Sequence, residues 1–269
     1  MIIIDYILKK KILSINILTW ICIIVILFII GYYIKTNPFE NFSRTRFLNK
    51  KETQMFFKLD EDKYISKLTP YDINAQQSLT KDEYKFNISI SADSFTPIEK
   101  NRLIIACKKA DFALKTINEP GFDGHKASDL PWNIALTCGK KYENGYPHTR
   151  LDTIFLSDRA LNTSDFQLAK TMLHEKVHIY ERKYPKDIDV WMKASGYKKD
   201  KRWDEYKNAR SNPDINDWSY LGPDGKPMVV LYNKDKPKSI ADVDYPVYDE
   251  PASEHPYEAL AYMLEKYLK

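Results

Sequence analysis

The sequence predicts an α+β protein with a transmembrane helix at its N-terminus. Residues 12–34 form an apolar run that no charged residue interrupts. Strand-like segments follow in the first half of the remaining chain, and helical spacing of apolar residues then predicts a long helix over 164–183 and a last helix over 257–268. A strand-bearing half, a central helix and a loop-rich half that ends in a helix are typical of the α+β class.

The apolar run is long enough to predict a membrane anchor. A helix needs about 20 apolar residues to cross the hydrocarbon core of a bilayer. Lysines at 9–11 and tyrosines at 32–33 flank the run, as they do at membrane interfaces. A cleaved signal peptide would have a shorter apolar core of about 7–15 residues. We therefore expect an uncleaved single-pass anchor over residues 1–35, and basic residues on both sides of it leave its orientation open.

The rest of the chain is expected to form a linker and one domain. Residues 36–80 are polar, with no sustained periodicity, and predict a juxtamembrane linker or stalk. Residues 81–269 are enough for one domain with a large buried core.

Several elements of this domain can be predicted individually. Alternation of polar and apolar residues predicts a strand at 85–91. Two further strands are predicted at 132–137 and 151–156, joined by a loop that contains glycine and proline. A proline followed by helically spaced apolar residues predicts a helix over 97–117. Two short apolar segments around 222–226 predict a hairpin.

Composition excludes some functions and leaves others open. The formal net charge is +4, from 41 basic and 37 acidic residues, which argues against a nucleic-acid-binding surface. Cys22 lies in the apolar run, and Cys107 and Cys138 are expected to be buried free thiols, although a disulfide between them stays open. The sequence does not predict an oligomeric state.

The most specific motif is His174-Glu175-Lys176-Val177-His178. Side chains four residues apart project from one face of a helix, so His174 and His178 can bind one tetrahedral zinc at about 2.0–2.1 Å. Glu175 can then reach a zinc-bound water and accept its proton. The alternative is a surface helix with two ordinary histidines, but apolar neighbours such as Met172 and Leu173 favour a buried helix.

A zinc hydrolase also needs a third protein ligand. The extended pattern with a third histidine six residues after His178 is excluded, because Glu181 and Tyr184 occupy its positions for glycine and histidine. Glu258, on the last predicted helix, is the best candidate. The alternatives are His255, Glu254, Asp214 and Asp217.

Glu258 also has a structural interpretation. Pro256 fits the first position of the last helix, which makes His255 the N-cap and Glu258 the third helical residue. Glutamate at that position is favoured by a capping box and by the helix dipole. The otherwise apolar helix and the small Ala261 one turn later favour the ligand role, because they allow close approach to the motif helix.

With this pattern, the chain resembles the gluzincin group of zinc metallopeptidases. The resemblance covers the helix of His174–His178 and the helix segment Glu258–Tyr262. It implies a zincin-like domain in which His174, His178 and Glu258 bind zinc and Glu175 is the general base.

The resemblance has two further implications. It makes the strand at 151–156 an edge strand that pairs with an extended peptide substrate; a plain core strand is the alternative. The chain departs from the best-known gluzincins at Tyr262, where a carboxylate would orient a metal-binding histidine. A second likeness, to uncharacterised metallopeptidases of large DNA viruses, covers Tyr146–Arg150, Arg210–Asp214 and His255–Glu258.

The sequence therefore predicts a membrane-anchored, zinc-dependent metallopeptidase that acts on a peptide or protein. The alternative is a non-catalytic, membrane-anchored binding or structural protein with a zinc-stabilised fold. Stabilisation of the oxyanion could come from several side chains, and the candidates are His148, Tyr220, Tyr232, His255 and Tyr257.

Overall fold

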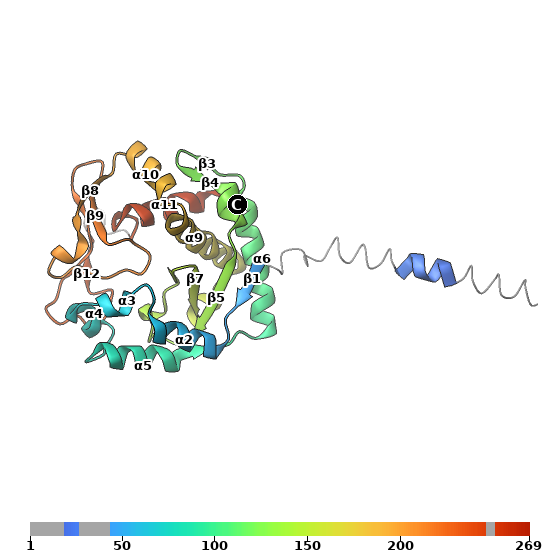
Figure 1. The fold of residues 1–269 in the computed structure, drawn as a ribbon, viewed down its shortest axis with the longest axis horizontal. Helices are drawn as coiled ribbons and strands as arrows, with labels where there is room; N and C mark the ends of the chain where they lie inside the picture. The colour runs from blue at the N-terminus through green and yellow to red at the C-terminus, as the bar shows by residue number, and fades with distance from the viewer. Residues whose placement is uncertain (1–18, 27–43, 246–250) are drawn as a thin grey trace, which may run out of the picture. The chain divides into compact units, whose positions relative to one another are not determined.

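The computed structural model describes residues 19–26, 44–245 and 251–269 (Figure 1). The chain divides into two units, Met1–Ser43 and Arg44–Lys269. In the first unit, residues 19–26 are helical and exposed. The second unit contains every predicted site residue.

The predicted membrane anchor is not supported. In the described part of the chain, no helix is long and apolar enough to cross a membrane. The rest of the predicted span lies outside the described residues. The transmembrane helix of the predicted fold class, and the membrane localisation that depends on it, are therefore not retained.

The second unit is built on a mixed five-stranded sheet. Its main path runs β1 (Thr45–Phe47), β5 (Trp132–Thr137), β7 (Thr153–Ser157) and β6 (His148–Arg150), and β2 (Ala92–Asp93) also pairs with β5. The pairs β1–β5 and β5–β7 are parallel, whereas β6 and β2 pair antiparallel with their neighbours.

Helices pack on both faces of this sheet (Figure 1). With parallel strands at its centre, the arrangement is mixed α/β and not the predicted α+β. The helices are α2 (Lys50–Leu59), α3 (Tyr64–Lys67), α4 (Pro70–Ala75), α5 (Lys81–Ser91), α6 (Pro97–Leu114), α7 (Gly124–Asp129), α8 (Asp158–Leu161), α9 (Asp165–Lys183), α10 (Pro185–Ala194) and α11 (Pro256–Leu264). Short 3₁₀ helices occur at Glu143–Gly145, Trp203–Glu205, Pro251–Ser253 and Glu265–Tyr267.

The remaining strands form small peripheral sheets. They are β3 (Asn118–Glu119) with β4 (Phe122–Asp123), β8 (Lys198–Arg202) with β9 (Trp218–Leu221) and β10 (Pro227–Met228), and β11 (Leu231–Tyr232) with β12 (Val243–Asp244).

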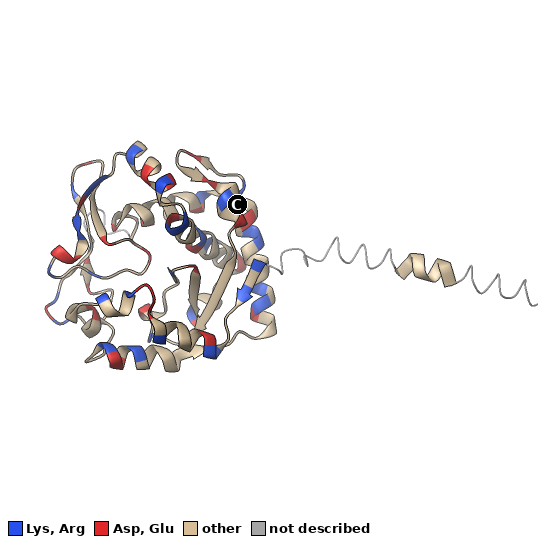
Figure 2. Ribbon diagram, viewed as in Figure 1, with Lys and Arg blue, Asp and Glu red and all other residues tan. Residues whose placement is uncertain are grey.

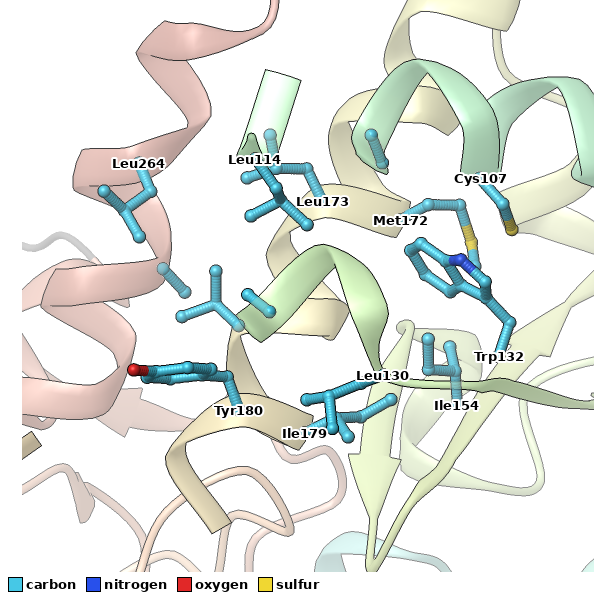
Figure 3. Close-up of a cluster of buried hydrophobic side chains, with 14 of the residues drawn as sticks. Cys107, Leu114, Leu130, Trp132, Ile154, Met172, Leu173, Ile179, Tyr180 and Leu264 are labelled. Carbon is cyan, nitrogen blue, oxygen red and sulfur yellow. The ribbon is translucent and has the colours of Figure 1, made fainter. Parts of the chain in front are cut away.

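The larger core lies between the sheet and helices α6, α9 and α11. Trp132 and Ile154 from the strands meet Met172 and Leu173 from α9, and Leu264 from α11 belongs to the same cluster (Figure 3). These side chains are almost fully buried. This packing fixes α9 against α11, and these two helices carry the predicted zinc ligands.

A second core covers the opposite face of the sheet. Along β7, Ile154 and Leu156 belong to the larger core and Phe155 between them belongs to the second, as expected when successive side chains alternate across a strand. Phe57 of α2 stacks on Phe155, with ring centroids 5.4 Å apart. Tyr84 and Ile88 of α5 complete this core.

The compact unit begins earlier than predicted. Residues from Arg44 onward, assigned to a linker over 36–80, form β1 and helices α2 to α4. Asn49 and Thr69 cap α2 and α4 with capping boxes. Residues 36–43 lie outside the described residues.

The predicted strand at 85–91 is wrong, because this segment belongs to helix α5. Thr80 caps the helix through a hydrogen bond from the Glu83 backbone N–H to its hydroxyl. Tyr84 and Ile88, four residues apart, are both fully buried. The helical face therefore decides the structure, and the alternation of polar and apolar residues does not.

Other predicted elements are confirmed with small shifts of their boundaries. Helix α6, strand β5, helices α9 and α11 and the β9–β10 hairpin lie where the sequence predicted them. The strand predicted at 151–156 begins at Thr153, because Leu151 has a left-handed φ of 52° in the turn after β6. Cys107 is buried and free as expected, whereas Cys138 is free but exposed. Basic and acidic residues are interspersed over the helices of this unit (Figure 2).

Candidate metal centre

Helix α9 brings the motif residues into the interior. Ser164 caps its N-terminus, accepting a hydrogen bond from the Gln167 backbone N–H. The helix packs between α6 and α11, so its central turns are buried on nearly every side. His178 is fully buried, and His174 and Glu175 are 9% and 3% exposed.

Three side chains converge on one point. The Nε2 atom of His174 lies 3.4 Å from Oε2 of Glu258, and Nε2 of His178 lies 3.9 Å from the same oxygen. The candidate ligand atoms of His174, His178 and Glu258 all lie within 4.8 Å of one another. In a tetrahedral site with bonds of about 2.0–2.1 Å, ligand atoms are roughly 3.3 Å apart. The cluster is close to that spacing, and small side-chain movements would complete it.

Both imidazoles are oriented by carboxylates on their other nitrogen. Nδ1 of His174 lies 3.0 Å from Oε1 of Glu265, and Nδ1 of His178 lies 2.7 Å from Oε2 of Glu181. An ionised carboxylate only accepts hydrogen bonds, so this pairing favours Nδ1–H and leaves the Nε2 lone pair directed at the cluster. Nε2 of His178 is buried and has no hydrogen-bond partner among the described residues. Buried polar atoms are normally paired, so an unpaired acceptor at this point is consistent with a metal ligand.

Glu258 is held in the cluster and does not cap its helix. The N-cap of α11 is His255, as predicted, and its Nδ1 accepts a hydrogen bond from the Tyr257 backbone N–H at 3.0 Å. Oε1 of Glu258 accepts from the side-chain amide of Asn212 at 3.0 Å, which leaves Oε2 facing the histidines. The structure therefore brings Glu258 to the two histidines, as the ligand interpretation requires.

The other proposed ligands do not join the cluster. Glu254 pairs with Arg210, and His255 is occupied by capping. Asp217 pairs with Lys67. Asp214 lies nearby, but it accepts the Thr149 backbone N–H at 2.7 Å.

The ionisable groups of the cluster shift one another's pKa values. Burial disfavours protonation of His174, but its hydrogen bonds to Glu258 and Glu265 outweigh this and raise its pKa well above the usual range. Burial lowers the pKa of His178 well below its usual range. Burial also acts to raise the pKa of Glu258, yet the hydrogen bond from His174 and the charge of the histidines lower it to about 2. The buried Glu258 carboxylate is therefore stabilised by the two histidines that face it.

Glu175 lies beside the cluster without joining it. The hydroxyl of Thr149, on strand β6, donates to its Oε2 at 2.8 Å and orients the carboxylate. Burial raises the pKa of Glu175 to about 7. Glu175 therefore lines the cavity next to the candidate ligands without being one of the three side chains that converge.

The cluster opens into one cavity of about 400 Å³. This is within the range of small-molecule and substrate sites. The segments behind the likeness to viral metallopeptidases all contribute to its wall, through Tyr146–His148, Arg210–Asp214 and Glu258. Residues far apart in the sequence are therefore gathered around the predicted metal ligands.

The predicted oxyanion-stabilising residues are mostly elsewhere. Only His148 lines the cavity. Tyr232 donates to Asp72, His255 caps α11, and Tyr220 and Tyr257 belong to the larger hydrophobic core. Tyr262 is a better placed candidate: it lines the cavity, and its ring meets His174 edge-on with centroids 4.6 Å apart.

The predicted edge strand is also displaced. The strand at the edge of the sheet is β6, because β7 lies between β5 and β6. The outward backbone of β6 is already bonded at Thr149, whose N–H donates to Asp214 and whose C=O accepts from Arg182 at 3.0 Å. Pairing with an extended peptide through this residue is therefore not favoured.

Several residues that shape the site escaped prediction. Thr149, Asn212 and Arg182 act through tertiary contacts, and Arg182 joins α9 to β6 and to the Pro213 carbonyl. The missing carboxylate at position 262 is replaced by Glu265, just beyond α11. Thr149 and Asn212 lie in segments of the likeness to viral metallopeptidases, but that likeness gave them no role. Glu265 had a local signal, because it follows Glu258 by seven positions, about two helical turns.

Comparison of the chain with protein-family models, with curated proteins and with solved structures gives no match. The resemblance to gluzincins therefore depends on the site residues themselves.

Replacing Glu181 with glutamine is expected to weaken zinc binding by about 10–100-fold, the usual cost of losing a partner that orients a ligand. Burial raises the pKa of Glu181 well above its usual range, and a cation on His178 would favour the ionised form. Competition with a zinc-binding dye measures the affinity, and Glu61→Gln, which removes the same charge from an exposed position, is the control. Equal affinity in both variants would contradict an orienting role for Glu181.

Proposed function

We propose that this protein is a zinc-dependent hydrolase that cleaves peptide bonds, with His174, His178 and Glu258 as the zinc ligands. The observation that supports it best is the convergence of two carboxylate-oriented imidazoles and one carboxylate beside Glu175. The gluzincin-like sequence pattern supports the same assignment.

The donor set favours zinc over other common metals. Two imidazole nitrogens and one carboxylate oxygen are typical of catalytic zinc, whereas magnesium and calcium prefer oxygen ligands. When bound, zinc would activate a water molecule for attack and polarise the scissile carbonyl.

Residues of the chain would supply the general base, the hydrogen bond to the oxyanion and the support of the metal ligands. Glu175, held by Thr149, takes the proton from the attacking water and passes it to the leaving amine. Tyr262, on the cavity wall beside His174, would donate a hydrogen bond to the oxyanion that develops on the scissile carbonyl. Asn212 and the carboxylates Glu181 and Glu265 hold the ligands in place.

The competing function is a non-catalytic protein that uses zinc for stability. Structural zinc sites usually have four protein ligands, often cysteines. Among the described residues, only three side chains form the cluster, and a cavity adjoins it. Three candidate ligands beside a cavity that Glu175 also lines favour catalysis.

Metal removal tests the proposal on the full chain. Purified protein is expected to contain about one zinc, to hydrolyse a mixture of quenched fluorescent peptides, to lose this activity on dialysis against a chelator, and to regain it when zinc is restored. Inductively coupled plasma analysis and fluorescence measure the two quantities. Bound zinc without hydrolysis would favour the structural alternative, and absence of zinc binding would overturn both.

A further inference from the structure

Glu143 is a buried carboxylate, and it forms no salt bridge with a basic side chain in the described part of the chain. It lies in the 3₁₀ helix before β6 and is only 4% exposed. The hydroxyls of Tyr64 and Tyr84 donate to its Oε1 at 3.0 and 2.9 Å. Both of these hydrogen bonds end on Oε1, and Glu143 lines the same cavity as the metal centre.

The other acidic residues of the cavity are accounted for. Glu175 is the proposed base. The rest have cationic or histidine partners: Glu254 with Arg210, Asp214 with Arg182 at 3.9 Å, Glu265 with Lys170 and His174, and Glu258 with His174 and His178. Glu143 is the cavity acid that remains without a cation or a catalytic role.

This arrangement is costly unless something compensates for it. A buried carboxylate is normally paired, because removing its charge from water without a partner is unfavourable. Burial accordingly raises the pKa of Glu143 to about 7. Tyrosines from two different helices, α3 and α5, nevertheless fix Oε1 and do not engage Oε2. The two tyrosines thus hold the Glu143 carboxylate in a fixed orientation in which it can bind a positively charged group.

The cavity as a whole is acidic, which suits a basic ligand group. Six acidic residues line it, and its two basic residues, Lys170 and Arg210, already pair with Glu265 and Glu254. A basic ligand group would supply the missing cation.

We propose that Glu143 determines specificity by binding a basic group of the substrate, a lysine or arginine side chain near the cleaved bond. The inference rests on the proposed hydrolase function and adds a substrate class to it. An ammonium or guanidinium group would donate to Oε2 while the two tyrosines hold Oε1.

The test uses the zinc-loaded full chain and quenched fluorescent peptides that differ at a single position, which carries Arg, Lys, Gln, Met or Glu. Separate peptide sets place this variable residue at each position along the peptide. Wild-type protein is expected to favour Arg or Lys at one position by about 10–100-fold in kcat/KM, the usual range for a hydrogen bond to a charged group. Glu143→Gln is expected to lose this preference while its kcat/KM on the Gln and Met peptides stays unchanged.

Matched variants separate recognition from general damage. Glutamine at position 143 can still accept hydrogen bonds from Tyr64 and Tyr84, so the fold should persist, and thermal unfolding checks this. Glu61→Gln, at an exposed position, should keep the full preference. If Glu143→Gln does not fold, Tyr64→Phe removes one of the two donors and should reduce the preference for basic peptides alone.

The outcomes distinguish this proposal from the proposed function. Hydrolysis without a preference for basic residues, or an equal loss on all peptides in Glu143→Gln, overturns the role of Glu143 and leaves the hydrolase function intact. If no peptide is cleaved, fluorescence anisotropy of a labelled Arg peptide measures whether the protein binds a basic group. Binding that Glu143→Gln weakens about 10-fold or more supports the basic-group site without the hydrolase, and absence of binding overturns both.

Discussion

Replacing Glu175 with glutamine is expected to reduce peptide hydrolysis by about 10²–10⁴-fold and to leave the zinc content unchanged. The loss follows because an amide cannot accept the proton of the attacking water. The zinc should remain because Glu175 lies outside the ligand cluster of His174, His178 and Glu258. Thr149 can still donate to the amide oxygen, so the side chain should keep its position.

Steady-state hydrolysis and metal analysis on the same samples measure these two effects. Glu61→Gln is the matched control, since it removes one carboxylate from an exposed position. Turnover near the wild-type rate would show that another group takes the proton. Loss of zinc together with activity would instead mean that Glu175 contributes to metal binding.

Sequence reasoning was most successful where the chemistry is local. The positions of His174, Glu175 and His178 follow from helical spacing alone, and the structure places them as expected. Glu258 could be chosen because few acids remained on an element that was predicted to pack inward. The structure brings it to the histidines through α11, whose Leu260 and Ala261 are fully buried.

Residues that act through tertiary contacts could not be predicted in the same way. Thr149 reaches Glu175 from strand β6, and Asn212 reaches Glu258 from a loop without regular structure. No periodicity marks either residue, because only the packing of distant segments gives them a partner. Glu143 belongs to the same group, since Tyr64 comes from the segment assigned to a linker and Tyr84 directly precedes the predicted strand at 85–91.

The errors in the fold have identifiable physical causes. Residues 85–91 alternate in polarity, but the cap at Thr80 and the buried pair Tyr84 and Ile88 favour helix α5. The segment from Arg44 to Thr80 has short amphipathic helices, too short for a periodic pattern to be recognised. Helices on both faces of a partly parallel sheet then change the architecture from α+β to mixed α/β.

Replacing Glu258 with alanine is expected to weaken zinc binding by well over 100-fold. Loss of a direct ligand should exceed the 10–100-fold typical of residues that only orient ligands. It also leaves two imidazoles, which cannot complete the three-ligand set of a catalytic zinc site. Hydrolysis should be lost together with the metal.

Glu265→Gln is the matched control for this variant, because Glu265 contacts His174 on its Nδ1 side and lies outside the ligand cluster. Its zinc affinity should fall only within the 10–100-fold range. A helix cap would behave differently: its loss costs about 1 kcal/mol of stability and leaves zinc binding unchanged. The cap of α11 is His255, so Glu258→Ala should not show that pattern. If it did, or if both variants bound zinc equally well, Glu258 would not be the third ligand and the proposed catalytic site would lack its carboxylate.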